Sequence, residues 1–297
     1  MRVVAGLVFL TFAGCSSILG IHDPVPGTDG GVDIDGPPGG KLEINVSQLR
    51  LDKRQAARIR VQYTSPAGGK TDVSALAQLS SSDTGVATGA AGTVSSGATA
   101  GTATLTASHA SATASLTVTV ANANCHPVIN ELKSAGAGGA ADEWVELYNP
   151  CLDAVDLTDW TLVYRGPNVT TGPDSSLMFS LSGQITAGGL ELYAGKDYAG
   201  AVDGRWSDAN GQMGGGAGSV GLRSGPKDTG PLVDSVLYGA AADVSQMNIF
   251  LRGTPSVPPT TTSSVARQPF DGTNTFDNGV DFALTTPTPR ATNTPAQ

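Results

Sequence analysis

Three glutamates lie close together in the sequence, Glu131, Glu143 and Glu146, and their spacing could support acid–base chemistry. Most glycoside hydrolases use two carboxyl groups on either side of the scissile bond, one as the general acid and the other as the base or nucleophile. Whether two of these glutamates can act together depends on the strands that carry them and on the register between those strands.

The segments around the glutamates form a predicted β-hairpin. Val128–Leu132 and Glu143–Asn149 are short and rich in apolar residues, and the Gly/Ala-rich stretch between them is typical of a loop. Cys125 precedes the first segment and Cys151 follows the second, so a symmetric antiparallel register places the two cysteines opposite each other. In an exported, oxidising compartment we expect them to form a disulfide, and the alternative is two free thiols. The bond would close a loop of about 26 residues and contribute about 3 kcal/mol in the chain-entropy model.

The same register determines on which face of the sheet each glutamate lies. It places Glu131 opposite Val145, so that Glu131 and Glu146 face opposite sides of the sheet. Asn130 then lies opposite Glu146, where a cross-strand hydrogen bond between the two side chains would order the sheet. We therefore predict structural roles for these residues, no catalytic site, and a protein that is not an enzyme.

The histidines His22, His109 and His126 do not suggest a metal site. No second histidine or aspartate stands at metal-ligand spacing from His126. Its neighbour Cys125 is assigned to the predicted disulfide, which argues against a Cys–His nucleophile. We predict no metal and no cofactor.

Two further patterns have a functional and a structural interpretation. Gly216–Gly221 matches a dinucleotide-binding fingerprint by letters, but it precedes a predicted strand where the fingerprint must follow one and open a helix, so we expect a flexible turn. Trp144, Trp160 and Trp206 could stack on sugars if exposed, but in small sandwiches such residues more often form the core.

The composition indicates many short strands. Among 297 residues there are 39 glycines and 18 prolines, only 5% of residues are aromatic, and the formal net charge is −9. No basic cluster extends beyond Lys53-Arg54, so the cationic surface that nucleic-acid binding needs is absent from the sequence pattern. We expect an all-β protein that does not bind nucleic acid.

The N-terminus has the pattern of an exported lipoprotein. Met1-Arg2 precedes an apolar run and the residues Ala13-Gly14-Cys15, which together resemble a signal peptide (1–14) with a bacterial lipobox. The resemblance implies lipidation of Cys15 and, because Ser16 follows, sorting to the outer membrane; the alternative is an ordinary signal peptide with a chance cysteine. Residues 15–40 are then the lipidated cysteine and a disordered tether, with an end-to-end distance of roughly 25 Å.

Residues 41–121 alternate apolar and polar side chains, as half-buried strands do. Runs such as Gly101–Ala107 and Leu116–Val120, together with Ser80–Asp83 and Val86–Thr88, resemble a bacterial immunoglobulin-like domain of the invasin/intimin type. The resemblance implies a small β-sandwich that serves as a spacer or an adhesive unit.

Residues 125–290 resemble a lamin-tail domain, and 291–297 form a C-terminal tail. The matching segments are Ile129–Glu131, Glu143–Asn149, Val155–Leu162, Ile185–Gly189, Val233–Gly239, Ser264–Arg267 and the tail pattern from Asp271 to Asn293. The resemblance implies a second immunoglobulin-like β-sandwich of a family that is generally non-catalytic.

The expected fold is therefore all-β, with two immunoglobulin-like β-sandwiches in tandem behind a lipoprotein signal and a flexible tether. The expected function is surface display, adhesion or scaffolding at the cell outer membrane, with the modules facing the cell surface or the periplasm. The expected partners are the membrane, through the lipid anchor, and a polysaccharide or surface protein. The alternative is a carbohydrate- or matrix-binding accessory module that retains a secreted enzyme at the cell surface.

Overall fold

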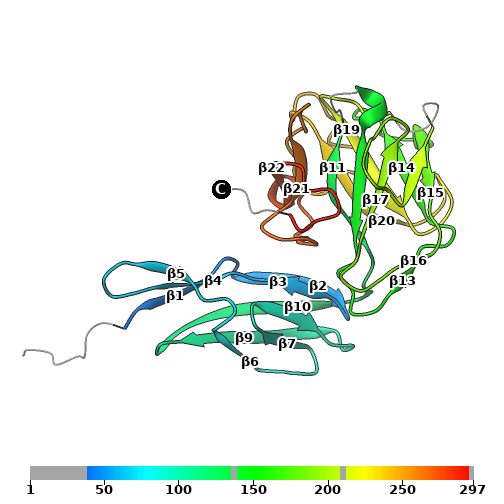
Figure 1. Cartoon of the computed structure of the whole chain (residues 1–297). Helices are drawn as coiled ribbons and strands as arrows, with labels where there is room; N and C mark the ends of the chain where they lie inside the picture. The colour runs from blue at the N-terminus through cyan, green and yellow to red at the C-terminus, as the bar shows by residue number, and fades with distance from the viewer. Residues whose placement is uncertain (1–38, 135–138, 208–211, 294–297) are drawn as a thin grey trace, which may run out of the picture. The chain divides into compact units, whose positions relative to one another are not determined.

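The computed structural model describes residues 39–134, 139–207 and 212–293. The predicted signal peptide, Cys15, His22 and nearly all of the predicted tether lie outside the described residues. The described chain is almost entirely β-structure, and its strands form separate sheets before and after the Cys125 region (Figure 1).

Residues 41–124 form three small sheets. The first has the order β1 (Lys41–Ile44), β4 (Val61–Thr64), β5 (Lys70–Asp72). The second has the order β2 (Gln48–Lys53), β10 (Ala112–Asn124), β9 (Gly101–His109), β6 (Gln78–Ser81), and the third the order β3 (Ala56–Arg58), β8 (Thr93–Ser96), β7 (Ala87–Ala90). Alternate residues of β9 and β10 are buried, among them Leu105, Leu116 and Val118 at 0% exposure, as the period-two pattern predicts.

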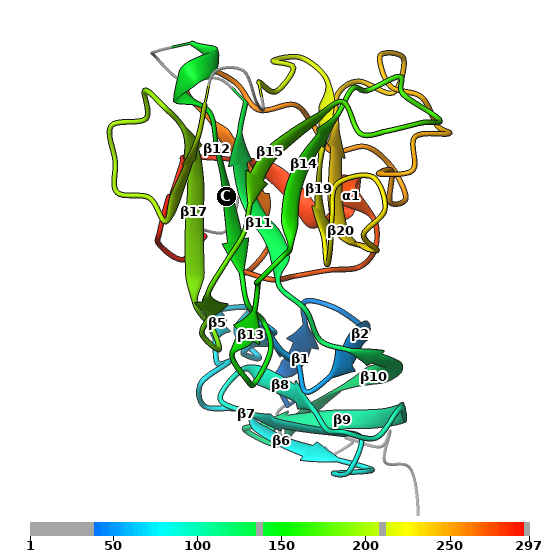
Figure 2. The same cartoon turned by 90° about the vertical axis from the view of Figure 1, so that its right-hand side faces the viewer.

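Residues 128–285 form a second sandwich. A six-stranded sheet has the order β18 (Gly204–Trp206), β17 (Leu190–Gly195), β12 (Trp144–Tyr148), β11 (Val128–Lys133), β21 (Ser264–Arg267), β22 (Phe282–Thr285). A four-stranded sheet has the order β15 (Ser176–Ser180), β14 (Thr161–Arg165), β19 (Gly218–Arg223), β20 (Leu232–Tyr238), and β13 (Val155–Asp156) pairs with β16 (Gln184–Ile185). Figure 2 shows the strands of both larger sheets. Within the described residues the only helical turns are η1 (Ala140–Asp142) and α1 (Asn278–Asp281).

One apolar core joins the two larger sheets of this second sandwich. Leu147 of β12, Leu162 of β14, Val220 of β19 and Val236 of β20 are all fully buried in it. Each such side chain contributes about 1.5–3 kcal/mol by leaving water, so the core holds the sheets face to face. The all-β class and the β-sandwich architecture expected from the sequence are confirmed.

The strands predicted for residues 128–132, 143–149, 160–164, 190–193, 219–222 and 232–238 correspond to β11, β12, β14, β17, β19 and β20. The alternating run from Ala57 to Tyr63 is divided between β3 and β4, which belong to different sheets. In the described parts of the chain no helix has the length and apolar composition needed to cross a membrane.

Candidate functional site

The hairpin that carries the glutamates does not keep the simple register. Val128 pairs with Tyr148 and Ile129 with Leu147, but the register then shifts, and Glu131 lies opposite Glu146. Our prediction that these two glutamates face opposite sides of the sheet is therefore wrong. The shift is a β-bulge in which the strand has one extra residue, Asn130.

The bulge is stabilised by the hydrogen bonds of the Asn130 side chain. Its amide nitrogen donates to Oε1 of Glu146 at 3.1 Å and to Oδ1 of Asp271 at 2.9 Å, and its oxygen accepts from the backbone N–H of Gly272 at 3.1 Å. The predicted Asn130–Glu146 hydrogen bond is confirmed. The contacts to Asp271 and Gly272 stabilise the bulge because they satisfy the hydrogen-bonding groups of an amide that is fully buried.

The paired glutamates lie on the face of the six-stranded sheet that is turned away from the core, yet both are fully buried. Residues after β22 cover them. Glu131 accepts hydrogen bonds from the Ser264 hydroxyl and from the backbone N–H of Thr288 at 3.0 Å, and Glu146 accepts from the backbone N–H of Arg290 at 2.5 Å.

Burial is the main influence on the charge of this pair. It raises the pKa of Glu146 to about 8, with smaller increases from the negative charges of Glu131 and Asp271, against the hydrogen bonds from Asn130 and Arg290. Burial likewise raises the pKa of Glu131. Two neighbouring carboxyl groups of different acidity are the electrostatic arrangement of an acid–base pair. In this structure, however, both are closed off by the chain itself, and their oxygens hold its backbone.

Glu143 has a different environment. Its Oε2 atom accepts from the backbone N–H of Met213 at 2.7 Å, and its Oε1 atom is buried and has no hydrogen-bond partner among the described residues. Burial raises the pKa of Glu143 to about 8. Beside this contact, the Tyr164 hydroxyl accepts from the N–H of Gly214, and the Tyr238 hydroxyl donates to the Gly214 carbonyl. These hydrogen bonds with Glu143, Tyr164 and Tyr238 therefore fix the glycine-rich segment that precedes β19.

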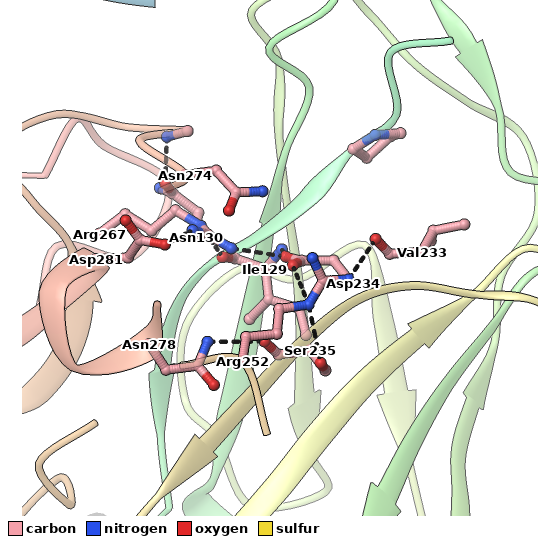
Figure 3. Close-up of polar contacts among 12 residues, drawn as sticks. Ile129, Asn130, Val233, Asp234, Ser235, Arg252, Arg267, Asn274, Asn278 and Asp281 are labelled. Atoms are coloured by element: carbon pink, nitrogen blue, oxygen red, sulfur yellow. Dashed lines mark hydrogen bonds and ion pairs between the residues drawn. The ribbon is translucent and has the colours of Figure 1, made fainter. Parts of the chain in front are cut away.

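A buried charge cluster links β11, β20, β21 and α1 (Figure 3). The Arg267 guanidinium lies 2.8 Å from Oδ2 of Asp234 and 3.4 Å from Oδ2 of Asp281, and each of these side chains is at most 1% exposed. Arg267 also donates to the carbonyl of Ile129 at 2.7 Å, while Arg252 approaches Asp234 at 3.9 Å from the other side.

The net electrostatic effect in this cluster favours ionised Asp234. Burial alone would raise its pKa, but Arg267, Arg252, His126 and the N–H of Ile129 together hold the pKa below its usual value. At Asp281 burial outweighs the attraction of Arg267, and the pKa is raised. The cluster thus stabilises the ionised form of Asp234 on β20.

A second buried cluster is centred on Asp174. Its carboxylate lies 3.0 Å from Arg165 of β14 and 2.7 Å from Arg223 of β19. Both guanidinium groups lie near the ring of Phe250, at 5.8 Å and 5.6 Å from its centroid. Arg165 also donates to the carbonyls of Val169 and Gly172, so the cluster closes the loop between β14 and β15.

The cysteines predicted to pair are joined. The disulfide links Cys125 and Cys151 with an S–S distance of 2.08 Å. Next to it, the backbone N–H of Leu152 donates to the backbone carbonyl of Arg54, and the side chains of Arg54 and Asp153 form a two-point ion pair.

The remaining candidate residues have local structural contacts. His109 packs edge-on against Tyr63, and His126 lies 3.7 Å from Asp52. Residues 218–221 belong to a strand and open no helix, so the dinucleotide pattern has no matching context. In the described ranges, no group of three or more His, Cys, Asp or Glu side chains is arranged to hold a metal ion.

The tryptophans differ in how far their side chains are exposed. Trp144 is 2% exposed and Trp206 is 4% exposed, so their rings are unavailable to a ligand. Trp160 is only partly buried and lines an open groove of about 470 Å³ together with Asp159, Ser180 and Lys227, among others.

Sequence reasoning missed the charged residues of the two buried clusters. Asp234 interrupts the apolar strand Leu232–Tyr238, and Arg267 closes the buried strand Ser264–Arg267. A charge inside an otherwise apolar strand is the signal that could have revealed a buried ion pair, because charged side chains are almost never fully buried unless paired.

One family of known proteins matches part of the chain. No protein with a curated description matches the chain. Among solved structures, a DUF4876 family protein from Bacteroides thetaiotaomicron VPI-5482 aligns with a TM-score of 0.43 and 10% identity, covering 84% of this chain and 96% of that one. Domains 5–6 of the S-layer protein SbsC align with a TM-score of 0.27 and 15% identity, covering 67% of this chain and 96% of that one. Residues 120–240 match the Lamin Tail Domain family, so this part of the chain is similar to an immunoglobulin-like lamin-tail module.

Proposed function

We propose that this chain is a non-catalytic lipoprotein of the outer membrane, anchored through lipidated Cys15, whose β-sandwiches display a binding surface for adhesion or scaffolding. The signal-like N-terminus and the lamin-tail similarity of residues 120–240 support this proposal. So does the resemblance of residues 41–121 to an invasin/intimin-type domain, which gives that part the role of a spacer or adhesive unit.

One observation carries the non-catalytic part of the proposal. The three glutamates with a spacing suited to acid–base chemistry are fully buried, and each accepts a backbone N–H of its own chain. A general acid or base must come within hydrogen-bond reach of a substrate proton. These carboxyl groups instead hold loop and tail segments, which is a structural use.

The anchor is tested by labelling cells with a palmitate analogue. The wild-type chain should incorporate the label and fractionate with the outer membrane, and Cys15→Ser should do neither. Cys125→Ser is the matched control because it removes a different cysteine, and it should keep the label. Absence of label from the wild-type chain would contradict the lipoprotein assignment.

Display is tested by protease treatment of intact cells, followed by blotting for the C-terminal module. Loss of the signal without lysis is expected for modules on the cell surface. Protection until the outer membrane is opened would refute surface adhesion and indicate a periplasmic scaffold.

A second candidate function is polysaccharide binding that retains a secreted enzyme, and Trp160 favours it. This partly exposed indole has no hydrogen bond to any described residue, and it lines the groove beside the polar side chains of Asp159, Ser180 and Lys227. An aromatic face with polar groups at its rim suits a sugar ring. Titration with polysaccharides should change the tryptophan fluorescence, and Trp160→Ala should abolish retention on the polysaccharide. Unchanged retention of that variant would exclude this groove as the binding site.

A further inference from the structure

The C-terminal segment 286–293, which we call the strap, lies across the outer face of the six-stranded sheet. In Figure 2 it is the red segment seen behind β17 and β12. It follows the edge strand β22, but side chains of the sheet and of the loop after β21 hold it instead of a regular strand ladder. Backbone N–H groups of Thr288, Arg290 and Asn293 donate to Glu131, Glu146 and Asp271 respectively.

The groups that surround Glu146 are mostly acidic. Glu131 faces it from β11 and Asp271 from the loop after β21, and Tyr198 lies within electrostatic range from the segment after β17. Arg290 is the basic residue of the strap, and its guanidinium pairs with Asp203. The carboxyl group of Glu146 therefore has no ion pair within the described residues, and its partners are the neutral donors Asn130 and the Arg290 N–H.

A second negative charge beside Glu131 is costly in this position. Ionised Glu146 would form stronger hydrogen bonds with its two N–H donors, but it would also lose water and repel two neighbouring carboxylates. Lifting the strap admits water to the face and relieves both penalties. The closed arrangement therefore suits a protonated Glu146, and the open one suits the ionised form.

We propose that residues 286–293 are a releasable strap, docked on Glu131, Glu146 and Asp271, and that loss of the Glu146 proton loosens it. When it lifts, the face bearing these three carboxyl groups becomes accessible to solvent. The strap turns at Pro289 and Arg290 and covers this face with its backbone N–H groups.

The direction of the pH response follows from the raised pKa of Glu146. The closed state holds the proton to about pH 8, whereas a solvated glutamate loses it near pH 4.5. Between these values the closed state binds more protons, so the strap loses stability as the pH rises. From pH 6 to pH 9 the population of the open state should rise roughly tenfold to a hundredfold.

Hydrogen exchange of the full chain, corrected for the intrinsic pH dependence of exchange, tests the proposal. Peptides covering residues 286–293 should lose protection between pH 6 and pH 9, while peptides from β14 and β19 keep theirs. Glu146→Gln keeps the shape and the acceptor without the charge, so its strap should stay protected across this range. Glu43→Gln makes the same chemical change at an exposed site and should behave as the wild-type chain.

Each outcome decides the proposal. Constant protection of the wild-type strap to pH 9, or equal loss in the wild-type chain and in Glu146→Gln, overturns it. Parallel loss in the strap and in β14 and β19 indicates global unfolding and overturns it as well. If Glu146→Gln fails to fold, constant protection of the wild-type strap, or parallel loss in strap and core peptides, still overturns the proposal.

Discussion

Replacing Arg267 with methionine should be among the most damaging single substitutions in the second sandwich. Methionine retains much of the apolar volume but removes the guanidinium that lies against Asp234 and Asp281. The carbonyls of Ile129 and Thr273 lose donors at the same time. Both aspartates are at most 1% exposed, so water cannot replace the missing charge without opening the structure.

The size of the effect follows from the burial of these groups. Removing one partner of a buried ion pair costs about 3–5 kcal/mol, because the other charge remains without compensation. Arg252 still lies 3.9 Å from Asp234 and partly compensates its charge, so we expect a loss of stability in the lower half of that range. For a domain of this size about 1 kcal/mol corresponds to roughly 2–4 °C in melting temperature, so the midpoint should fall by roughly 6–16 °C.

Urea denaturation of a double-mutant cycle provides the assay. The variants Arg267→Met, Asp234→Asn and the double substitution should show a coupling free energy of about 1–3 kcal/mol, because the second change removes the charge that the first one leaves unpaired. A loss below about 1 kcal/mol for Arg267→Met, or additive single effects, would refute the reasoning. Either result would mean that the buried cluster is solvated or rearranges easily.

Three further predictions concern other buried features. Replacing Cys125 and Cys151 together with serine should lower the free energy of unfolding by about 3 kcal/mol in urea titrations, and an unchanged midpoint under reducing conditions would contradict this. Burial raises the pKa of Glu143 to about 8, so the folded state holds more protons than the unfolded state between pH 4.5 and pH 8, and stability should fall as the pH rises through that window. Glu143→Gln should reduce this fall by about 2–4 kcal/mol in denaturation at pH 5 and pH 9, and identical pH profiles would show that Glu143 is solvated. Asp174→Asn should lower the melting temperature by roughly 6 °C or more in calorimetry, because two buried arginines lose their shared carboxylate, and a shift below about 2 °C would argue against an ion pair there.

The sequence predicts the strands and the disulfide because both depend on local patterns. Alternating side chains identify β9 and β10, and the two cysteines flank a hairpin whose first two residue pairs have the predicted register. The bulge at Asn130 could not be predicted in this way. It depends on Asp271, which is 141 residues away in the sequence. The local alternation of apolar and polar residues along a strand carries no information about such a distant contact. For the same reason the face of Glu131 was predicted wrongly, since a shift of one residue exchanges the two faces of a strand.

The buried charges also show what distinguishes the two parts of the chain. The fully buried polar residues described between 41 and 124 are uncharged, whereas the second sandwich buries Arg165, Asp174, Arg223, Asp234, Arg267 and several other charged residues. Buried ion pairs often stabilise a protein no better than apolar residues of the same volume, so stability alone does not account for them. These arginines, however, also donate to loop carbonyls, those of Gly172, Gly230 and Thr273. Each guanidinium therefore fixes a loop as well as neutralising an aspartate. Loops that are already ordered would lose little conformational entropy on binding a ligand, which is what the proposed display role would require.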